Sequence, residues 1–456
     1  MKIQDFLDSS AIDNVKKALE RAKSHSESGA LISLTEERAM ERAKLVDAGE
    51  ISGRLKGVPF IVKDNFLAFG GPTTAASNML KTFDAPVQAT AVEKLEAEGA
   101  ICIGKANLDA FAHGGSTENS AFGPTKNAVD DQRVAGGSSG GSAVSVALDI
   151  VPFALGSDTG GSIRQPASFN GVVGVKPTYG MVSRFGVVAM ASSTDTIGCF
   201  ATSAADADLI MEIMAGQDRR DMTTLTRSWQ DSPSLSRKKV GVIRQFMDDG
   251  IDTDVKRATT DYIEKLKKLG YEVEDVDLDM AKYALAIYYI IVPAEVMSNL
   301  ARYDGVHYGH RSESARTLVD LYGKSRDEGF ELENKRRIMI GSFVLSSGFF
   351  DAYYLKAQKA RALLINEFKQ LFERYDVLVG PVSPTPAFLL GENTADPIKM
   401  YLADVMTVPA SIAGLPAMSV PAGVSSEGLP IGVQLIGNHH ADHSLLMLAQ
   451  EVEELA

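Results

Sequence analysis

Short apolar runs alternate with more polar segments along the chain. The apolar runs are rich in Val, Ile and Leu, which predicts buried β-strands at residues 57–64, 100–104, 151–155, 239–243 and 271–276. Segments between these runs predict helices at residues 90–99, 142–148 and, with amphipathic spacing, 253–269. Strands that alternate with helices in this way favour an α/β fold built on a mixed or parallel sheet.

The order of these patterns predicts a single domain over residues 1–456. We expect four successive parts: an N-terminal helical segment at residues 1–50, a core with the candidate catalytic residues at 51–210, a βαβ unit and helical excursion from the sheet at 237–375, and a return to the core sheet at 376–456. The charged stretch 31–46 predicts a helix, and the polar stretch 217–236 predicts a loop.

Composition narrows the class of protein. The net charge of −13 opposes a broad nucleic-acid-binding face. The first residues lack the pattern of a secretory leader, and no uninterrupted apolar run approaches the ~20 residues of a membrane span, so we expect a cytoplasmic protein without a membrane partner. Cys102 and Cys199 have no paired spacing, and Cys102 is expected to pack in the core. His439, His440 and His443 are either a solvated surface cluster or a weak metal site.

Residues 136–166 carry the most informative chemistry, because two Gly/Ser clusters flank an apolar segment. Ser138 and Ser162 occupy equivalent places in the two clusters, and free N–H groups in such turns can hold a negative charge. The apolar segment argues against a flexible linker, and neither cluster has the lysine of a phosphate-binding loop. Residues 136–140 also fit a nucleophile elbow formally, although the residues before them predict a polar loop instead of a strand.

A serine nucleophile needs a base, and Lys63 is a candidate because it ends an apolar strand. Burial there would lower the pKa of its amine. The alternative is a surface lysine paired with Asp64. His113 is the one histidine near the Gly/Ser region, and the sequence assigns it no carboxylate partner.

Two sequence blocks carry a resemblance to a known family. Residues 136–142 (GGSSGGS) and 156–167 (GSDTGGSIRQPA) are similar to the long signature of the amidase signature family, and residues 57–65 (GVPFIVKDN) resemble its lysine segment. Ser138 and Ser162 are 24 positions apart, as the family's motif requires. The resemblance implies an amidase-signature fold, an α/β architecture with a central mixed β-sheet flanked by helices on both sides.

The resemblance also implies the role of each residue. Ser162 would be the nucleophile, and Ser138, after a cis Gly137–Ser138 bond, would connect it to Lys63 as the base. Asp158 and Arg164 would organise the loop. The backbone N–H groups of an oxyanion hole would come from four consecutive residues: Thr159, Gly160, Gly161 and Ser162.

Within the family, the chain is most similar to the glutamine-hydrolysing subunits of tRNA-dependent amidotransferases. Arg337 and Asp404 match the pair that binds the carboxylate and ammonium of glutamine, although each could instead form an ordinary structural ion pair. The resemblance implies that this chain binds no cofactor or metal. A partner B subunit would use ATP and Mg²⁺ and bind Glu-tRNA(Gln), with a small C subunit beside it. The alternatives are a stand-alone amidase that acts on other carboxamides and a catalytically silent scaffold.

Overall fold

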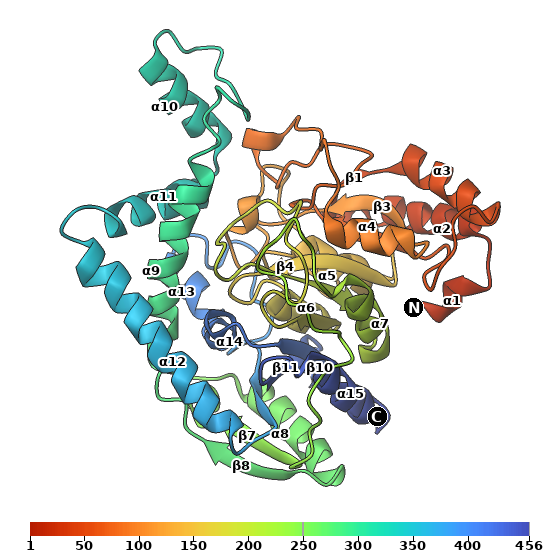
Figure 1. The fold of residues 1–456 in the computed structure, drawn as a ribbon, viewed down its shortest axis with the longest axis vertical. Coiled ribbons are helices and arrows are strands. Elements are labelled where there is room, and N and C mark those ends of the chain that lie inside the picture. Colours follow the sequence, from red (N-terminus) through yellow and green to blue (C-terminus); the bar gives the residue numbers. More distant parts are fainter. Residues whose placement is uncertain (249, 456) are drawn as a thin grey trace.

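The computed structural model describes residues 1–248 and 250–455. Its centre is a mixed sheet of eleven strands among these residues, in the order β1-β3-β2-β4-β6-β5-β10-β11-β9-β7-β8. The pairs β2–β3, β2–β4, β7–β8 and β7–β9 are parallel, and the other neighbours are antiparallel. The sheet brings β5 (Val173–Lys176) beside β10 (Ala417–Val424), which joins the first half of the chain to its C-terminal part (Figure 1).

The strands are short, as the apolar runs predict. Their bounds are β1 Leu31–Leu34, β2 Pro59–Lys63, β3 Ile101–Ala106, β4 Phe153–Asp158, β5 Val173–Lys176, β6 Thr196–Ala201, β7 Lys239–Ile243, β8 Glu272–Val276, β9 Val377–Pro381, β10 Ala417–Val424 and β11 Pro430–Gly437.

The helices vary from single turns to 20 residues. The α-helices are α1 Gln4–Leu7, α2 Ala11–Ser24, α3 Glu36–Asp47, α4 Thr90–Ala97, α5 Gly140–Ala147, α6 Arg164–Asn170, α7 Ala204–Met214, α8 Thr253–Lys268, α9 Ala281–Leu300, α10 Leu318–Gly329, α11 Leu332–Val344, α12 Lys356–Phe372, α13 Pro397–Leu402, α14 Val408–Ala413 and α15 Asp442–Glu453. Short 3₁₀ turns and one π-helical turn complete them: η1 Ser26–Ser28, η2 Asn78–Leu80, η3 Ala110–Ala112, η4 Arg244–Phe246 and the π turn η5 Phe350–Leu355.

Both faces of the sheet are covered, because successive side chains of a strand point to opposite faces. In β2, Phe60 and Val62 belong to one apolar cluster with residues of α4, α7 and α15. Ile61 belongs to another cluster, with residues of α2, α3 and α5. The prediction of a mixed sheet with helices on both sides is therefore confirmed.

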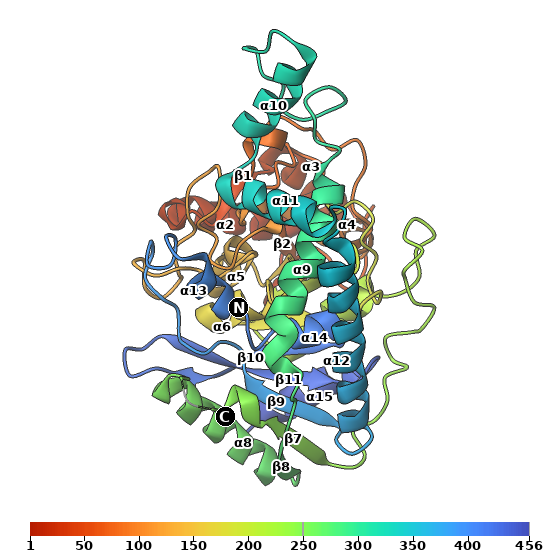
Figure 2. The same cartoon turned by 90° about the vertical axis from the view of Figure 1, so that its left-hand side faces the viewer.

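Residues 237–375 divide into a βαβ unit and a helical part. The strands β7 and β8 lie in the same sheet and form one of its edges, so this βαβ unit extends the sheet. The helices α9 to α12 leave it, and α10 lies at the far end of the molecule (Figures 1 and 2). The helix α9 is long and apolar enough to cross a membrane by length and composition alone. Half of its most apolar 18-residue window is buried, and it packs against α11, α12 and α14.

The N-terminal segment differs from the prediction at one place. Residues 31–34 form the edge strand β1, which pairs with β3, and the helix α3 begins at Glu36. Strand β1 is half-buried throughout, so it lacks the apolar alternation that would distinguish it from the start of a helix. Residues 217–236 contain no helix or strand, as predicted.

Candidate active site

Lys63 ends β2 and places its amine beside two serine hydroxyls. The strand β2 runs parallel to β4, so the carboxyl ends of both strands meet at one end of the sheet. Lys63 Nζ donates hydrogen bonds to Ser138 Oγ at 2.8 Å and to Ser157 Oγ at 3.0 Å. Asn65 Nδ2 donates to the same Ser157 oxygen at 3.0 Å. The amine is therefore held by short contacts at a fixed position.

The environment of Lys63 favours its uncharged form. Burial lowers the pKa of Lys63 to about 7, although the charge of Asp109 and two further buried aspartates opposes this change. An amine with this pKa is uncharged in a large fraction of molecules near neutral pH and can accept a proton. The alternative of a surface lysine paired with Asp64 is wrong, because Lys63 is fully buried and Asp64 lies 3.8 Å from Lys105 Nζ instead.

Ser138 and Ser162 come from two loops that touch through the backbone. The N–H of Ser139 donates to the carbonyl of Ser162 at 3.2 Å. The Gly137–Ser138 peptide bond is cis, which confirms that prediction, and a side chain at Gly137 would collide with the carboxylate of Asp109. Among the described residues, the Ser162 hydroxyl makes no hydrogen bond. The structure thus joins Lys63 to Ser138 directly and holds Ser162 beside them through the main chain.

The loop between β4 and α6 presents a run of free donors. The four backbone N–H groups from Thr159 to Ser162 donate to no acceptor within residues 1–248 and 250–455. Thr407 Oγ1 donates to the carbonyl of Gly160 at 2.7 Å, which fixes that peptide plane and turns the N–H of Gly161 the opposite way. Gly161 has φ +154°, and a Cβ there would collide with Thr407 Oγ1. This loop can therefore receive a negatively charged oxygen.

Asp158 and Arg164 hold the loop from Thr159 to Ser162 in place through buried hydrogen bonds. Arg164 Nε and Nη2 donate to the two oxygens of Asp158 at 3.0 Å each, and both side chains are fully buried. The Asp158 carboxylate also accepts from the N–H of Ile163 at 3.1 Å, and Arg164 Nη1 donates to the carbonyl of Thr407 at 2.8 Å. The paired charges have their hydrogen bonds satisfied, so they hold the loop without facing a substrate.

Arg337 lies on α11 and lines a cavity of about 190 Å³. Its Nε donates to Glu333 Oε1 at 2.9 Å, and the guanidinium lies over the rings of Tyr289 and Tyr401. In the described residues, Nη1 and Nη2 donate to no protein acceptor. Arg337 is thus partly engaged in a structural ion pair, while the outer edge of its fork is available for a carboxylate.

Asp404 lines the same cavity without an ion-pair partner among the described residues. Burial raises the pKa of Asp404 to about 8, although Arg337 opposes this change. Gln165 Nε2 donates to Asp404 Oδ1 at 3.4 Å, and Gln165 Oε1 accepts from the N–H of Gly137 at 2.9 Å. One amide side chain therefore connects Asp404 to the loop of Ser138.

The cavity adjoins the serines without being lined by them. Its lining includes Asp109, Ser116 and Asp404, whereas Ser138 and Ser162 are not lining residues. A Cβ at Gly161, next to the nucleophile candidate, would lie 3.3 Å from Asp404 Oδ1. The cavity therefore reaches the Gly/Ser loops on the side of Asp404.

Sequence reasoning missed several residues of this site. The sequence places Gln165 within the signature motif without a separate role, and it gives Thr407 no role. Their contacts explain why: the partners Gln165 and Asp404 are 239 positions apart, and Thr407 and Gly160 are 247 positions apart. No local pattern could have indicated either contact.

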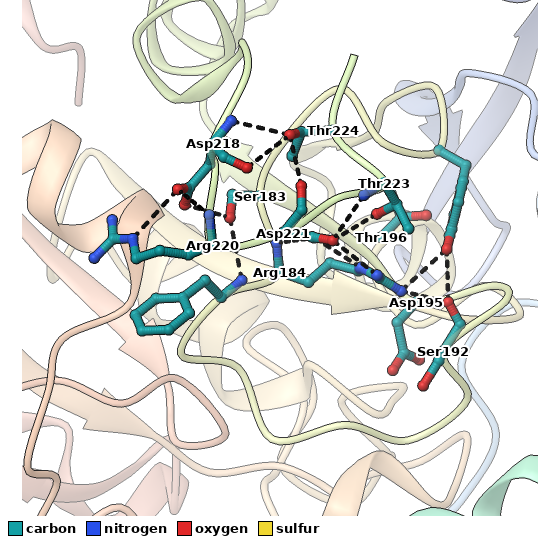
Figure 3. A network of polar contacts seen from close by, with 12 residues as sticks. Ser183, Arg184, Ser192, Asp195, Thr196, Asp218, Arg220, Asp221, Thr223 and Thr224 are labelled. Carbon is teal, nitrogen blue, oxygen red and sulfur yellow. Dashed lines mark hydrogen bonds and ion pairs between the residues drawn. The ribbon is translucent and has the colours of Figure 1, made fainter.

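A second polar network joins Ser183, Arg184, Asp218 and Asp221 (Figure 3). Arg184 pairs with both oxygens of Asp221, at 2.9 and 3.0 Å, and so anchors the start of the 217–236 loop. A cavity of about 220 Å³ is bounded by Arg184, Asp221 and Asp195 and reaches Ser157 and thus the contacts of the Lys63 amine. Thr159 Oγ1 donates to Asp195 Oδ1 at 2.8 Å, which links the network to the loop of free donors.

The remaining candidates lie outside this site. Cys102 is fully buried in β3, as predicted, and burial raises the pKa of its thiol to about 11. His443 contacts Asp208 at 2.8 Å, and the rings of His439 and His440 are 6.1 Å apart. Within the described part of the chain, no group of three or more His, Cys, Asp or Glu side chains could hold a metal ion.

The fold and this Lys–Ser arrangement can be compared with known proteins. The chain belongs to the amidase family, whose sequence model matches residues 13–446. It is 50% identical over 454 residues to the A subunit of glutamyl-tRNA(Gln) amidotransferase from Caldanaerobacter subterraneus subsp. tengcongensis, with 98% of this chain and 93% of that protein covered.

Two solved structures extend the comparison. The A subunit of glutamyl-tRNA(Gln) amidotransferase from Thermotoga maritima superposes with a TM-score of 0.83 at 39% identity, over 100% of this chain and 94% of that one. A bacterial aryl acylamidase of the amidase signature family superposes with a TM-score of 0.85 at 25% identity, over 98% and 93%. The same fold therefore serves both an aryl acylamidase and part of an amidotransferase.

Proposed function

We propose that this chain is the glutaminase subunit of an amidotransferase that converts Glu-tRNA(Gln) to Gln-tRNA(Gln) with glutamine as the nitrogen donor. The observation that carries the catalytic part is the buried amine of Lys63, with a pKa of about 7 and a 2.8 Å hydrogen bond to Ser138. The nearly full-length similarity to the A subunits of glutamyl-tRNA(Gln) amidotransferases supports the choice of reaction.

In the proposed mechanism, Ser162 attacks the side-chain amide carbon of glutamine. Uncharged Lys63 accepts the proton of Ser162 through the hydroxyl of Ser138. The oxygen of the tetrahedral intermediate becomes negatively charged and accepts hydrogen bonds from the free N–H groups of the 159–162 loop, each worth ~3 kcal/mol in such sites. Proton return to the leaving nitrogen releases ammonia and leaves a γ-glutamyl ester on Ser162, which water hydrolyses to glutamate.

Substrate recognition requires a cation and an anion close together in the cavity, because the α-carboxylate and α-ammonium of glutamine are bonded to the same carbon. The free edge of Arg337 suits the α-carboxylate of glutamine. Ionised Asp404 accepts from the α-ammonium. Because the pKa of Asp404 is about 8 without substrate, binding of the ammonium near neutral pH displaces a proton from this carboxyl group. The pair would thus select a free amino acid over a simple amide.

The rest of the reaction belongs to partners in this proposal. Glu-tRNA(Gln) is activated with ATP and Mg²⁺ on a B subunit, a small C subunit completes a cytoplasmic heterotrimer, and this chain binds no cofactor. The net charge of −13 agrees with tRNA contacts made mainly by a partner. Exposed apolar side chains on α10, α11 and η5 offer surface for an assembly: Leu318, Val319, Leu332, Met339, Phe343 and Tyr353.

Co-expression with candidate B and C chains tests this proposal. We expect the purified complex to form Gln-tRNA(Gln) from Glu-tRNA(Gln), ATP and glutamine, and to accept ammonium in place of glutamine. The measurement is the amide linked to tRNA, quantified after deacylation. A complex that hydrolyses glutamine but never transfers nitrogen to tRNA would refute the assignment.

The aryl acylamidase similarity keeps one alternative open, a stand-alone amidase that acts on other carboxamides. That enzyme would share Lys63, Ser138 and Ser162, so the triad does not separate the two functions. An assay of amide hydrolysis by the isolated chain decides between these two functions. A stand-alone amidase hydrolyses simple aryl or alkyl amides without partners, whereas the proposed subunit prefers glutamine and depends on its complex.

A further inference from the structure

His113 lines the proposed glutamine cavity and has a buried polar atom without a hydrogen-bond partner among the described residues. Its side chain is fully buried and lines the cavity together with Arg337 and Asp404. Its Nε2 atom has no hydrogen-bond partner among residues 1–248 and 250–455. A buried polar atom without a partner is unfavourable, so it indicates a group that is paired when a ligand is bound.

Asn334 determines which nitrogen of this ring carries the proton. Its Nδ2 donates to the carbonyl of Ala110 at 2.8 Å and lies 2.5 Å from His113 Nδ1. The carbonyl of Ala110 can only accept, so the amide group must be oriented with its NH₂ toward both atoms. His113 Nδ1 therefore accepts a hydrogen bond, and in the neutral ring the proton lies on Nε2.

The ring is also neutral when the cavity is empty. Burial lowers the pKa of His113 well below its ordinary value, and the nearby charge of Arg337 lowers it further. His113 thus has a single uncharged N–H donor, at Nε2, and the contact with Asn334 fixes this tautomer.

Asn334, which contacts His113, lies on the same face of α11 as Arg337. Asn334 and Arg337 are three residues apart on α11, so their side chains are neighbours on one side of the helix. His113, bonded to Asn334, lies next to the guanidinium whose terminal nitrogens have no protein acceptor in the described structure. His113 and Arg337 both line the cavity, and a carboxylate is the ligand group with enough lone pairs to accept from both residues.

We propose that His113 is a substrate-binding residue that donates its Nε2–H to the α-carboxylate of glutamine beside Arg337, with Asn334 as the positioning residue that fixes its tautomer. This inference rests on the proposed glutaminase function. It adds a neutral donor to the pair of charged residues and makes recognition of the carboxylate depend on a hydrogen bond of defined direction.

Two substitutions of His113 distinguish a role as hydrogen-bond donor to the substrate from a role in packing. His113→Asn keeps a short polar group within reach of Asn334 but removes the donor to the cavity. His113→Gln extends its amide to the position of Nε2 and can still donate. The assay compares glutamine with 4-aminobutanamide, which is glutamine without its α-carboxylate, in the complex with its partner subunits.

For His113→Asn we expect kcat/KM for glutamine to fall about 10- to 100-fold, the cost of a lost hydrogen bond to a charged group. Most of the change should be in KM. The value for 4-aminobutanamide should stay within about twofold, because this substrate has no carboxylate to lose the contact. His113→Gln should recover a large part of the preference for glutamine. Ammonium-driven transamidation and the melting temperature serve as controls for folding.

Each other outcome overturns the proposal. Equal losses for both substrates would make His113 a packing residue, and no loss for glutamine would show that Nε2 does not contact substrate. Failure of the proposed function looks different, because the wild-type complex itself would then not hydrolyse glutamine. The tautomer has an independent test, since long-range ¹H–¹⁵N NMR of histidine-labelled protein should show His113 Nδ1 without a proton, and a protonated Nδ1 would contradict the account.

Discussion

Lys63 shows how one residue acquires its chemistry from its position. An exposed lysine is charged at neutral pH, but at the end of β2 the amine is removed from water and surrounded by Ser138 and Ser157. Burial lowers the pKa of Lys63 to about 7, despite three buried aspartates whose charges favour the ammonium. The balance leaves a base that is available without a histidine.

The pH dependence of turnover follows from this pKa. Only the uncharged amine can accept a proton, so at saturating glutamine kcat should rise about tenfold per pH unit below pH 7 and level off above it. The ratio kcat/KM should include a second group near pH 8, because Asp404 must be ionised to bind the ammonium. The measurement is steady-state glutamine hydrolysis between pH 5.5 and 9. A kcat that is constant across this range, or that rises only near pH 10, would contradict an uncharged Lys63.

At the scale of elements, the site is a junction of chain segments that are distant in sequence. The loop from Thr159 to Ser162 follows β4 and precedes α6, yet its carbonyl at Gly160 is held by Thr407 at the start of α14. This contact fixes the peptide plane whose N–H is a candidate oxyanion donor. The geometry of the loop therefore depends on Thr407, whose hydroxyl bonds to the carbonyls of Gly160 and Asp404 instead of to Ser138 or Ser162.

Replacing Thr407 tests this dependence. Thr407→Val keeps the shape of the side chain and removes the hydroxyl donor, so the Gly160–Gly161 peptide can rotate. We expect kcat for glutamine hydrolysis to fall at least about tenfold, less than the ~100- to 1,000-fold of a donor lost outright. Unfolding free energy should change by only about 1 kcal/mol. Thr407→Ser restores the hydroxyl and should recover kcat. Equal activity of the Val and wild-type proteins would separate Thr407 from the oxyanion loop.

Elements and motifs were predictable to different degrees. Strands β2, β3 and β7 and helix α8 follow from apolar runs and amphipathic spacing, since these signals are local. Strand β1 does not, because it lies half-buried at an edge. The roles of Lys63, Ser138 and Ser162 follow from residue chemistry together with a family resemblance. The sequence assigns His113 no partner, because its partner is the amide of Asn334, 221 positions away, which only the folded chain brings near.

On the scale of the whole molecule, the sheet joins the site to the surface on which an assembly would form. The serine loops lie at the ends of β2 and β4, while Arg337 comes from the helical part that leaves the sheet (Figure 2). The strand order places β7 and β8 at one edge, which no local pattern encodes because β7 joins the rest of the sheet through β9, a strand distant in sequence. The proposed glutamine cavity thus lies where the sheet and the helical part meet.

The most direct test of the account removes one oxygen atom, that of Ser162. In the complex with its partner subunits, Ser162→Ala should lower glutamine hydrolysis and glutamine-driven transamidation at least about 1,000-fold, because the acyl-enzyme cannot form. Ammonium-driven transamidation should continue at the wild-type rate, since it bypasses this site. The matched control is Ser142→Ala on α5, which removes a buried hydroxyl that donates to the carbonyl of Leu155 and should leave glutamine use intact. Wild-type glutamine hydrolysis by the Ser162→Ala complex would contradict the central claim.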